Sequence, residues 1–339
     1  IYMLPGVFIA LPGGFLIKRF GDKRLLLIGL ALMAVGGAIV GLLDSYDGAI
    51  MGRIVSGSGS VVLTVVATKM VVDWFAGKEI RTGLAVMLAA WPFGIALGLA
   101  SQSWVAETYS WQAVMYITSG VSIVGLIGAA ILVRPAEIAG EDPGGRLFSI
   151  SMRELVLASL AGVAWALFNA GFSIHISFTP DVLMNAGHSA IEAGAIVSVG
   201  IWVTMVATPV GGLIVDRLGS PYLFLLVVMI GLAFTVAAFP YLAIPLVLSV
   251  LFGLWTGPGA GPIVALPSDV LRPENRGPGL GVFFTWYYVA MAIAPPLAGA
   301  GRDWTGSSST PLLIAAGLYI GIIAVIFVFR SYARKPSVA

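Results

Sequence analysis

The sequence predicts an all-α polytopic membrane protein built from two pseudo-symmetric helix bundles. Three observations lead to this fold class. Of the 339 residues, 59% are hydrophobic and only 10% are charged, whereas soluble domains carry about 25% charged residues. Apolar runs of about 20 residues, the length that crosses a bilayer, follow one another along the chain. A charged turn, GGFLIKRFGD at residues 13–22, recurs as GGLIVDRLGS at residues 211–220, 198 positions later.

Eleven apolar runs of spanning length are visible. The stretch 221–266 is divided in two because it is too long for one span, with the turn expected at Pro240 and Tyr241. The chain opens inside the first run without an initiator methionine. We therefore expect a twelfth span ahead of the visible ones. The eleven expected spans are residues 1–17, 25–43, 48–72, 82–104, 112–133, 154–178, 189–215, 221–240, 241–266, 278–300 and 311–329.

The connections between these runs alternate between a basic set and an acidic set. Basic residues favour the cytoplasmic side of a membrane, so the alternation predicts a multi-pass protein of the cell (inner) membrane with a cytoplasmic C-terminus. The acidic set holds Asp44, Asp47, Glu107, Asp181 and Asp303, with Arg302 as its base. The basic set holds 15 of the 18 lysines and arginines: Lys18, Arg19, Lys23, Arg24, Lys78, Arg81, Arg134, Arg146, Arg153, Arg217, Arg272, Arg276, Arg330, Arg334 and Lys335.

A polar linker divides the chain into two domains. Residues 135–153 are rich in Pro, Gly and charged residues, as a cytoplasmic linker between two halves would be. This predicts an N-terminal bundle at 1–134 that lacks its first span, and a six-span bundle at 154–339. A second repeated element, E-x-R followed by glycine, occurs at 79–83 and at 274–279, an offset of 195 residues. Repeated halves are a common design of membrane transporters.

Several classes of function are excluded by what the chain lacks. It has no cysteine, which excludes disulfides, thiol catalysis and cysteine metal sites. It has no phosphate-binding G-x-x-x-x-G-K-[ST] loop and no basic patch for nucleic acid. With only two histidines, at 175 and 188, we expect no metal, no cofactor and no enzyme activity. A membrane enzyme is the weaker alternative, and a non-transporting sensor or scaffold of the same fold is another. Uptake of a solute would distinguish a transporter from a sensor or scaffold, and chemical conversion of a solute would indicate an enzyme.

The repeated turns resemble the signature of the major facilitator superfamily of secondary transporters, G-x-x-x-D-R-x-G followed by basic residues. Gly212, Asp216, Arg217 and Gly219 match it in the second half, and Gly14, Arg19 and Gly21 match it in the first, where Lys18 replaces the aspartate. The residues RIVSGSG at 53–59 resemble a second family motif, whereas WPFGIALG at 91–98 matches the fifth-span motif only loosely. The sequences PGGFLIKRFGDKR at 12–24 and WPFGIALG at 91–98 are most similar to the branch of cyanate and nitroimidazole transporters.

The resemblance implies a cytoplasmic gate made by these signature residues. In the family, the signature closes the cytoplasmic side of the outward-facing state. Asp216 is well placed for this role because a carboxylate can bind the positive N-terminus of a neighbouring helix, and glycines let the helices approach closely. Lys18 cannot act as a carboxylate, and Asp22 is a possible substitute. The plain alternative is a charged turn that obeys the positive-inside rule.

Arg53 is the most informative charge inside an expected span. A charge there is costly and usually faces a cavity or a partner. Gly57, Ser60, Thr64 and Thr68 lie on the same helical stripe as Arg53. The stripe predicts the wall of a water-filled path or a close helix contact. If Arg53 is functional, it favours an anionic substrate or a proton-linked carboxylate on a neighbouring helix. The alternative is that Arg53 extends its side chain to the membrane surface.

Four further residues are predicted substrate contacts. Asn169 lies near the middle of the sixth expected span, which lines the central cavity in the family. Trp255 and Thr256 lie in GLWTGPGAGP at 253–262, a stretch rich in helix breakers, which often mark a site or gate. Tyr288 belongs to an aromatic cluster in the tenth expected span. The alternative roles are an interhelical hydrogen bond for Asn169, helix packing for Trp255 and Thr256, and contact with lipid for Tyr288.

These observations predict secondary active transport of a small solute by alternating access. An organic or inorganic anion is the candidate solute. The expected spans hold no carboxylate near their middle, so the coupling ion is left open, with a proton as one candidate. Besides the solute we expect the lipid bilayer as partner, and a monomer.

Overall fold

The computed structural model describes residues 3–76, 79–134 and 150–334. These residues form α-helices, two short 3-10 helices and turns, and contain no strand, which confirms the all-α class. The predicted linker lies mostly outside the described residues. The elements are α1 (Leu4–Phe20), α2 (Asp22–Leu42), α3 (Tyr46–Trp74), α4 (Ile80–Thr108), α5 (Trp111–Leu132), α6 (Met152–Asn185), α7 (Ala190–Leu218), α8 (Pro221–Ala238), α9 (Pro245–Ala265), η1 (Leu266–Asp269), η2 (Pro273–Asn275), α10 (Arg276–Thr305) and α11 (Thr310–Ala333).

The eleven described α-helices correspond one to one to the eleven expected spans. Nine of them are long and apolar enough to cross a membrane, and the other two, α1 and α4, contain the shorter apolar stretches Pro5–Ile17 and Ile80–Ile95. The expected turn at Pro240 and Tyr241 is confirmed, because α8 ends at Ala238 and α9 begins at Pro245. Helix α6 is longer than expected, 34 residues, because it begins at the capping box of Ser151 and Glu154 and continues past Phe178 to Asn185.

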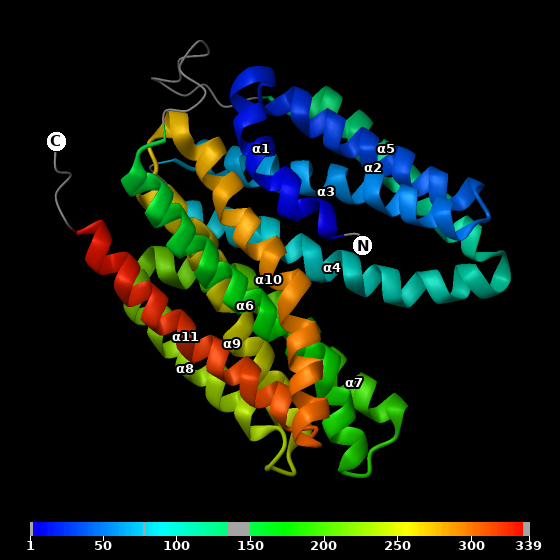
Figure 1. Ribbon diagram of the computed structural model, residues 1–339, viewed down its shortest axis with the longest axis vertical. Coiled ribbons are helices and arrows are strands. Elements are labelled where there is room, and N and C mark those ends of the chain that lie inside the picture. Colours follow the sequence, from blue (N-terminus) through cyan, green and yellow to red (C-terminus); the bar gives the residue numbers. More distant parts are fainter. Residues whose placement is uncertain (1–2, 77–78, 135–149, 335–339) are drawn as a thin grey trace.

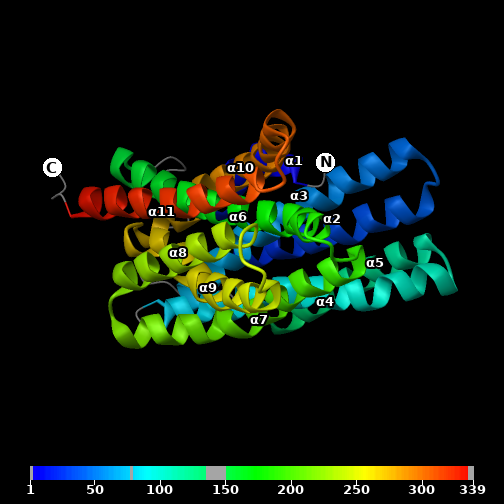
Figure 2. The ribbon, with the colours of Figure 1, turned by 90° about the horizontal axis from the view of Figure 1, so that it is seen from below.

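The helices pack in two groups, which we call the N-terminal group (α1–α5) and the C-terminal group (α6–α11). In the N-terminal group α2 packs on α3 and α5, and in the C-terminal group α6 packs on α10 and α11 while α7 packs on α9. Figure 1 shows the first group in blue to green at upper right and the second in green to red at lower left. Figure 2 shows the same separation from below.

Glycines bring helices of one group into close contact. A Cβ added to Gly36 of α2 would lie 2.6 Å from the carbonyl oxygen of Gly52 on α3, and one added to Gly29 would lie 2.9 Å from that of Gly59. Such distances exclude any side chain at these positions. In a bilayer, where apolar surface gains nothing by leaving lipid for protein, close van der Waals packing of this kind holds helices together.

The stretch GLWTGPGAGP is rich in glycine and proline, which can break a helix, but it does not interrupt α9. Helix α9 runs unbroken through it from Pro245 to Ala265. The glycines instead serve packing against α7: Gly253 faces the backbone of Gly200, and Gly257 faces Thr204 and Ala207. The small residues therefore act as contact surface between helices, the role that was the alternative in the sequence analysis.

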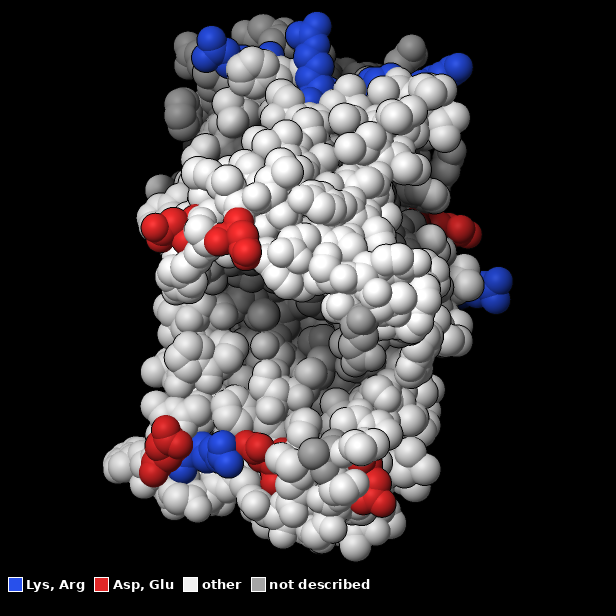
Figure 3. Space-filling view, turned by 90° about the vertical axis from the view of Figure 1, so that its right-hand side faces the viewer, with Lys and Arg blue, Asp and Glu red and all other residues white. Residues whose placement is uncertain are grey.

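The two groups contact each other at one end and separate at the other. Between them, α1 packs on α10, α4 packs on α7 and α9, and α3 contacts α10. The groups meet at the upper left of Figure 1 and diverge toward the lower right. Figure 3, viewed from that right-hand side, shows a hollow between them whose wall is white wherever its residues are described. The closed end carries the α1–α2, α3–α4, α7–α8 and α9–α10 connections, and we call it the basic end.

Candidate functional site

Two contacts between the groups close the basic end, and we call them the α4–α7 seam and the α1–α10 seam. At the α4–α7 seam, Asp216 of α7 accepts hydrogen bonds from the backbone N–H of Thr82 (2.9 Å) and from its hydroxyl (2.8 Å). Thr82 is the third residue of α4, so its N–H is one of the unpaired donors of a helix N-terminus. The carboxylate thus neutralises the positive end of the α4 dipole.

Arg81 adds an ion pair to the same seam. Its guanidinium donates to both carboxylate oxygens of Asp269 in η1, at 3.0 and 3.1 Å. It also lies 3.8 Å from Asp216, a distance for attraction without a hydrogen bond. Gly212 of α7 makes this approach possible, because a Cβ there would lie 2.9 Å from the carbonyl oxygen of Arg81. One arginine of the N-terminal group therefore faces two carboxylates of the C-terminal group.

The α1–α10 seam uses a glycine contact and a separate ion pair. Gly14 of α1 lies directly against the backbone of Gly277 on α10, and an added Cβ would collide with it. Beside it, the Arg276 guanidinium binds the carboxylate of Asp73, which is fully buried at the end of α3, at 2.6 Å. Asp73 also pairs with Lys69 one turn earlier (3.0 Å). The seam is closed by Asp73, a residue that the sequence analysis did not assign to it.

Asp22, the suggested substitute for the missing aspartate, pairs with Lys69 of its own group. The ammonium of Lys69 lies 3.1 Å from both carboxylate oxygens of Asp22, and both side chains are buried. This pair links the start of α2 to α3. The side chain of Lys18 lies outside the described part of the structure.

The two seams are related by the internal repeat. Arg81 and Arg276 are the arginines of the two E-x-R elements, 195 positions apart, and Asp73 and Asp269 are 196 positions apart. In each seam an arginine at the start of one helix therefore binds an aspartate of the other group. The exchange is reciprocal, because each group supplies one arginine and one of these aspartates.

The other signature residues shape the turns or face outward. Gly21 (φ 76°) and Gly219 (φ 63°) end α1 and α7 in backbone conformations with positive φ, which side chains with a Cβ adopt at a cost. Arg19 is exposed and lies 5.7 Å from the Phe20 ring. Arg217 is exposed as well. The signature therefore divides into two turn-forming glycines, two seam glycines, one seam carboxylate and exposed bases.

The predicted substrate contacts fall in different surroundings. Arg53 is exposed in the second turn of α3, while Gly57 and Thr68 further along its stripe are buried. Thr64 and Thr68 donate their hydroxyls to backbone carbonyls of their own helix. The stripe thus runs from an exposed arginine to a buried end, and the hydroxyl protons of its two threonines are already used.

Asn169 and Thr256 are both buried in the C-terminal group. The amide of Asn169 donates to the carbonyl oxygen of Trp165, 2.9 Å away on the same helix. The hydroxyl of Thr256 has no hydrogen-bond partner among the described residues, and neither do the indole N–H of Trp165 and the hydroxyl of Tyr319. Buried polar groups are usually hydrogen-bonded, so these three, together with the hydroxyl of Ser249 on α9, have capacity left for a solute or water.

Trp255 and Tyr288 are packed against other helices. The ring of Trp255 covers Gly231 of α8, and the ring of Tyr288 covers Gly6 of α1. Tyr288 is buried and also makes an edge-to-face contact with Tyr287. Trp255 therefore lies between helices of the C-terminal group, and Tyr288 lies between the two groups. His175 is buried between Phe239 and Phe252 and is hydrogen-bonded to Thr179, as a packing histidine would be.

Sequence reasoning missed most of the charges at the seams. Arg81 and Arg276 were visible as a repeat and were not assigned a contact. Lys69 and Asp73 were visible as an i, i+4 pair of opposite charge. Neither the repeat nor the i, i+4 pair indicates which helix of the other group lies opposite these charges.

A membrane-embedded fold of two helix groups, with a hollow between them and charged contacts closing one end, defines the class of alternating-access carriers. The sequence matches the model of the Major Facilitator Superfamily over residues 1–295 and again over residues 155–339. The chain belongs to this family, which confirms the resemblance found in the sequence.

Individual relatives are distant and cover nearly the whole chain. The chain is 24% identical to the hexuronate transporter of Bacillus subtilis (strain 168), over 96% of this chain and 83% of the relative. It is 26% identical to the transcription regulatory protein OpdE of Pseudomonas aeruginosa, over 97% and 84%. The E. coli fucose:proton symporter FucP has the same fold, with a TM-score of 0.77 at 18% identity over 98% of this chain and 90% of FucP. A second FucP structure, in the outward conformation, matches with a TM-score of 0.76, 17% identity and coverages of 98% and 89%.

Family and fold identify the protein as a multi-pass membrane protein that performs secondary transport of a small solute. This confirms the function expected from the sequence. The family is one of transporters rather than enzymes. The narrower resemblance to the cyanate and nitroimidazole branch stays a prediction.

The buried ion pair of the α1–α10 seam predicts a large loss of stability when it is broken. Asp73→Asn leaves Arg276 and Lys69 with one carboxylate fewer in a buried site, which typically costs about 3–5 kcal/mol. Asp181→Asn is the matched control, because Asp181 pairs with Arg302 at 2.8 Å with both side chains partly exposed, a kind of pair worth about 0–1 kcal/mol. Thermal unfolding in detergent should show a lower midpoint for Asp73→Asn and little change for Asp181→Asn. Equal shifts would contradict the importance of this seam.

Proposed function

We propose that this protein carries a small organic anion across the cell membrane by alternating access, as a monomer, with its basic end and C-terminus in the cytoplasm. The observation that carries the proposal is the pair of seams, which closes one end of a fold that is hollow at the other. The similarity to a hexuronate transporter supports an organic anion as solute. The N-terminal bundle (1–134) and the C-terminal bundle (154–339), joined by the linker (135–153), are proposed as the moving parts.

The distribution of charge supports this orientation. The basic end carries Arg19, Lys23 and Arg24 around the α1–α2 turn and Arg330 and Arg334 at the end of α11. Positively charged connections favour the cytoplasm. With the basic end inside, the hollow between the groups opens to the outside. The described conformation is then outward-facing, in agreement with the fold match to FucP in its outward conformation.

In this proposal the seams are the cytoplasmic gate. Inward opening must separate α4 from α7 and α1 from α10. It therefore breaks the bonds of Asp216 to Thr82, of Arg81 to Asp269, and of Arg276 to Asp73. Hydrogen bonds to charged groups contribute about 1.5–3 kcal/mol each, so the gate favours the outward-facing state strongly and the cycle must offset this. Gly14, Gly212, Arg19, Gly21, Arg217 and Gly219 support the gate by close packing and by shaping its turns.

The substrate contacts are proposed from charge and from unused hydrogen-bonding capacity. Arg53, exposed near the start of α3, would attract the carboxylate of an anion that approaches from the open end. Thr256 on α9 would offer its unpaired hydroxyl deeper inside, and Asn169 on α6 is a second buried candidate. Trp255 and Tyr288 would act by holding the helices that frame the site. A proton is the proposed coupling ion, to be tested by imposing a pH gradient.

The direct test is uptake of a radiolabelled hexuronate into proteoliposomes, with a neutral hexose as comparison solute. Arg53→Ala should reduce hexuronate uptake by about tenfold or more, since one well-placed charge contact is worth roughly 1.5–3 kcal/mol. Arg302→Ala, which removes a partly exposed arginine near the end of α10, should stay within about twofold. Full uptake by Arg53→Ala would refute its role. Binding without accumulation would instead favour a sensor, the alternative that the name of the relative OpdE supports.

The gate is tested by the access of a thiol reagent from the cytoplasmic side. The chain has no cysteine, so Ala85→Cys gives a single reporter at a fully buried position facing Gly212 and Gly261. Asp216→Asn should raise the rate of its alkylation in inside-out vesicles about tenfold, because a weakened charge-assisted bond shifts the equilibrium by about 1.4 kcal/mol or more. Asp303→Asn, on the last turns of α10, is the control. An unchanged rate of alkylation in Asp216→Asn would contradict a gate at this seam.

A further inference from the structure

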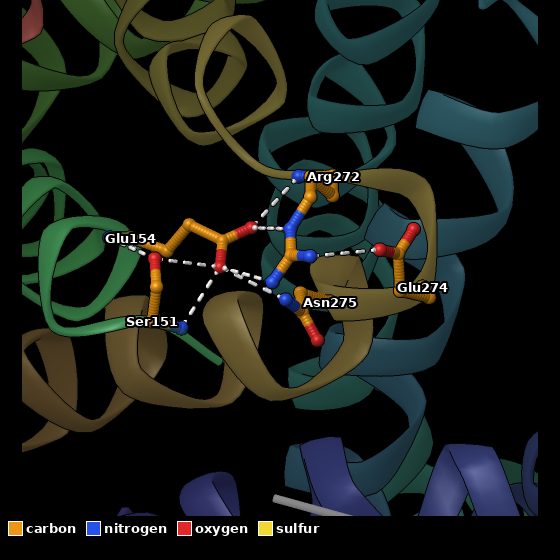
Figure 4. A network of polar contacts seen from close by, with 5 residues as sticks. All are labelled: Ser151, Glu154, Arg272, Glu274 and Asn275. Carbon is orange, nitrogen blue, oxygen red and sulfur yellow. Dashed lines mark hydrogen bonds and ion pairs between the residues drawn. The ribbon is translucent and has the colours of Figure 1, made fainter. Parts of the chain in front are cut away.

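Glu154, in the first turn of α6, is a buried carboxylate with hydrogen bonds on both oxygens (Figure 4). One oxygen accepts from the backbone N–H of Arg272 (3.0 Å) and from its Nε (3.2 Å). The other accepts from Arg272 Nη2 (3.2 Å), from the side-chain amide of Asn275 (2.9 Å), and from Ser151 through its backbone N–H and hydroxyl (2.9 Å each). A capping residue of a helix needs only the Ser151 bonds. The bonds to Arg272 and Asn275 therefore call for a second role.

That second role is to hold the segment 266–275, which connects α9 to α10. Arg272 and Asn275 both belong to this segment, and Asn275 is fully buried. Below them, Leu271 of the segment packs with Ala158 of α6 and Val282 of α10 in a small apolar cluster. The segment contains only two short 3-10 helices, η1 and η2, which are too short to be rigid by themselves. Its attachments to α6 and to α10 therefore help to fix its position.

The same segment places both charges that the C-terminal group contributes to the ion pairs of the seams. Asp269, which binds Arg81, lies three residues before Arg272. Arg276, which binds Asp73, directly follows Asn275. One carboxylate thus fixes the two residues that flank the seam charges, without being one of the charges itself. The bonds of Glu154 described above all stay within α6 and this segment.

We propose that Glu154 is a positioning residue for the whole cytoplasmic gate: it acts through Arg272 and Asn275 to set Asp269 and Arg276 against their partners in both seams. This inference rests on the gate proposed above. It has a specific consequence. Loss of Asp216 weakens the α4–α7 seam directly, whereas loss of the Glu154 charge weakens both seams together.

The reason lies in the exposure of the partner. About half of the Arg272 side chain is exposed, 55% against 6% for Glu154. Without the carboxylate, the guanidinium of Arg272 loses these bonds and can turn toward water or toward Glu274, which lies 3.4 Å away. The segment then loses the attachment that fixes Asp269 and Arg276. The N-terminal group still presents Arg81 and Asp73, but their partners are no longer held in place.

The test compares two seam reporters with one interior control in the full chain. Ala85→Cys reports on the α4–α7 seam. Ile17→Cys reports on the α1–α10 seam, because Ile17 is buried against Gly277. Ser249→Cys, buried between α9 and α7, reports on unfolding of the C-terminal group. Glu154→Gln should raise cytoplasmic alkylation several-fold at both seam reporters and leave Ser249→Cys protected.

Asp216→Asn separates the possible outcomes. If Asp216→Asn raises alkylation at Ala85→Cys while Glu154→Gln changes neither seam reporter, the positioning role is overturned and the gate stands. If neither variant changes any reporter, the gate itself is overturned. If Glu154→Gln also exposes Ser249→Cys, the C-terminal group has unfolded, and the milder variant Arg272→Gln is measured instead. In that variant, opening at both seams supports the proposal, and two protected seams refute it.

Discussion

Charge at the junction of two helix groups, buried at Asp73 and partly exposed at Arg81 and Asp269, is the constraint on which the structure depends. A guanidinium or carboxylate inside a membrane protein is costly unless a partner compensates it. At the basic end the partners of Arg81 and Arg276 come from the opposite group, Asp269 for the first and Asp73 for the second. Neither group can satisfy these charges in the same way when the groups separate. The closed end is therefore closed by electrostatics as well as by packing, and its opening requires new partners or water.

The two seams solve this problem differently. At the α4–α7 seam a carboxylate binds the N-terminus of a helix, and Arg81 faces two carboxylates. At the α1–α10 seam the equivalent position is Lys18, and closure relies on backbone contact between Gly14 and Gly277 beside the pair Asp73–Arg276. When the groups separate, Asp73 keeps Lys69 as a partner on its own helix, whereas Asp216 and Asp269 both lose Arg81. The seams therefore differ in which charge loses its cross-group partner on opening: Arg276 at the α1–α10 seam, and the two carboxylates at the α4–α7 seam.

The sequence predicted the all-α membrane fold and its eleven visible helices because apolar runs and charged turns are local signals. It also predicted that Asp216 would meet a helix N-terminus, because the family signature and the helix dipole point to the same contact. It could not assign the partners of Arg276 or Glu154, which depend on segments more than a hundred residues away. The sequence also could not show that the rings of Trp255 and Tyr288 pack against other helices. In a helix that is apolar all round, the sequence does not show which face meets protein and which meets lipid.

We propose that the seams at the basic end hold the two groups in one of two alternating arrangements. Pulsed electron paramagnetic resonance distances between paired spin labels test it most directly, using the exposed positions Phe20 and Leu218 at the basic end and Tyr46 and Trp304 at the other. In the double variant Asp73→Asn and Asp216→Asn, we predict a longer distance between the labels at the basic end and a shorter one between those at the opposite end. Unchanged distances at both ends, or longer distances at both, would contradict it.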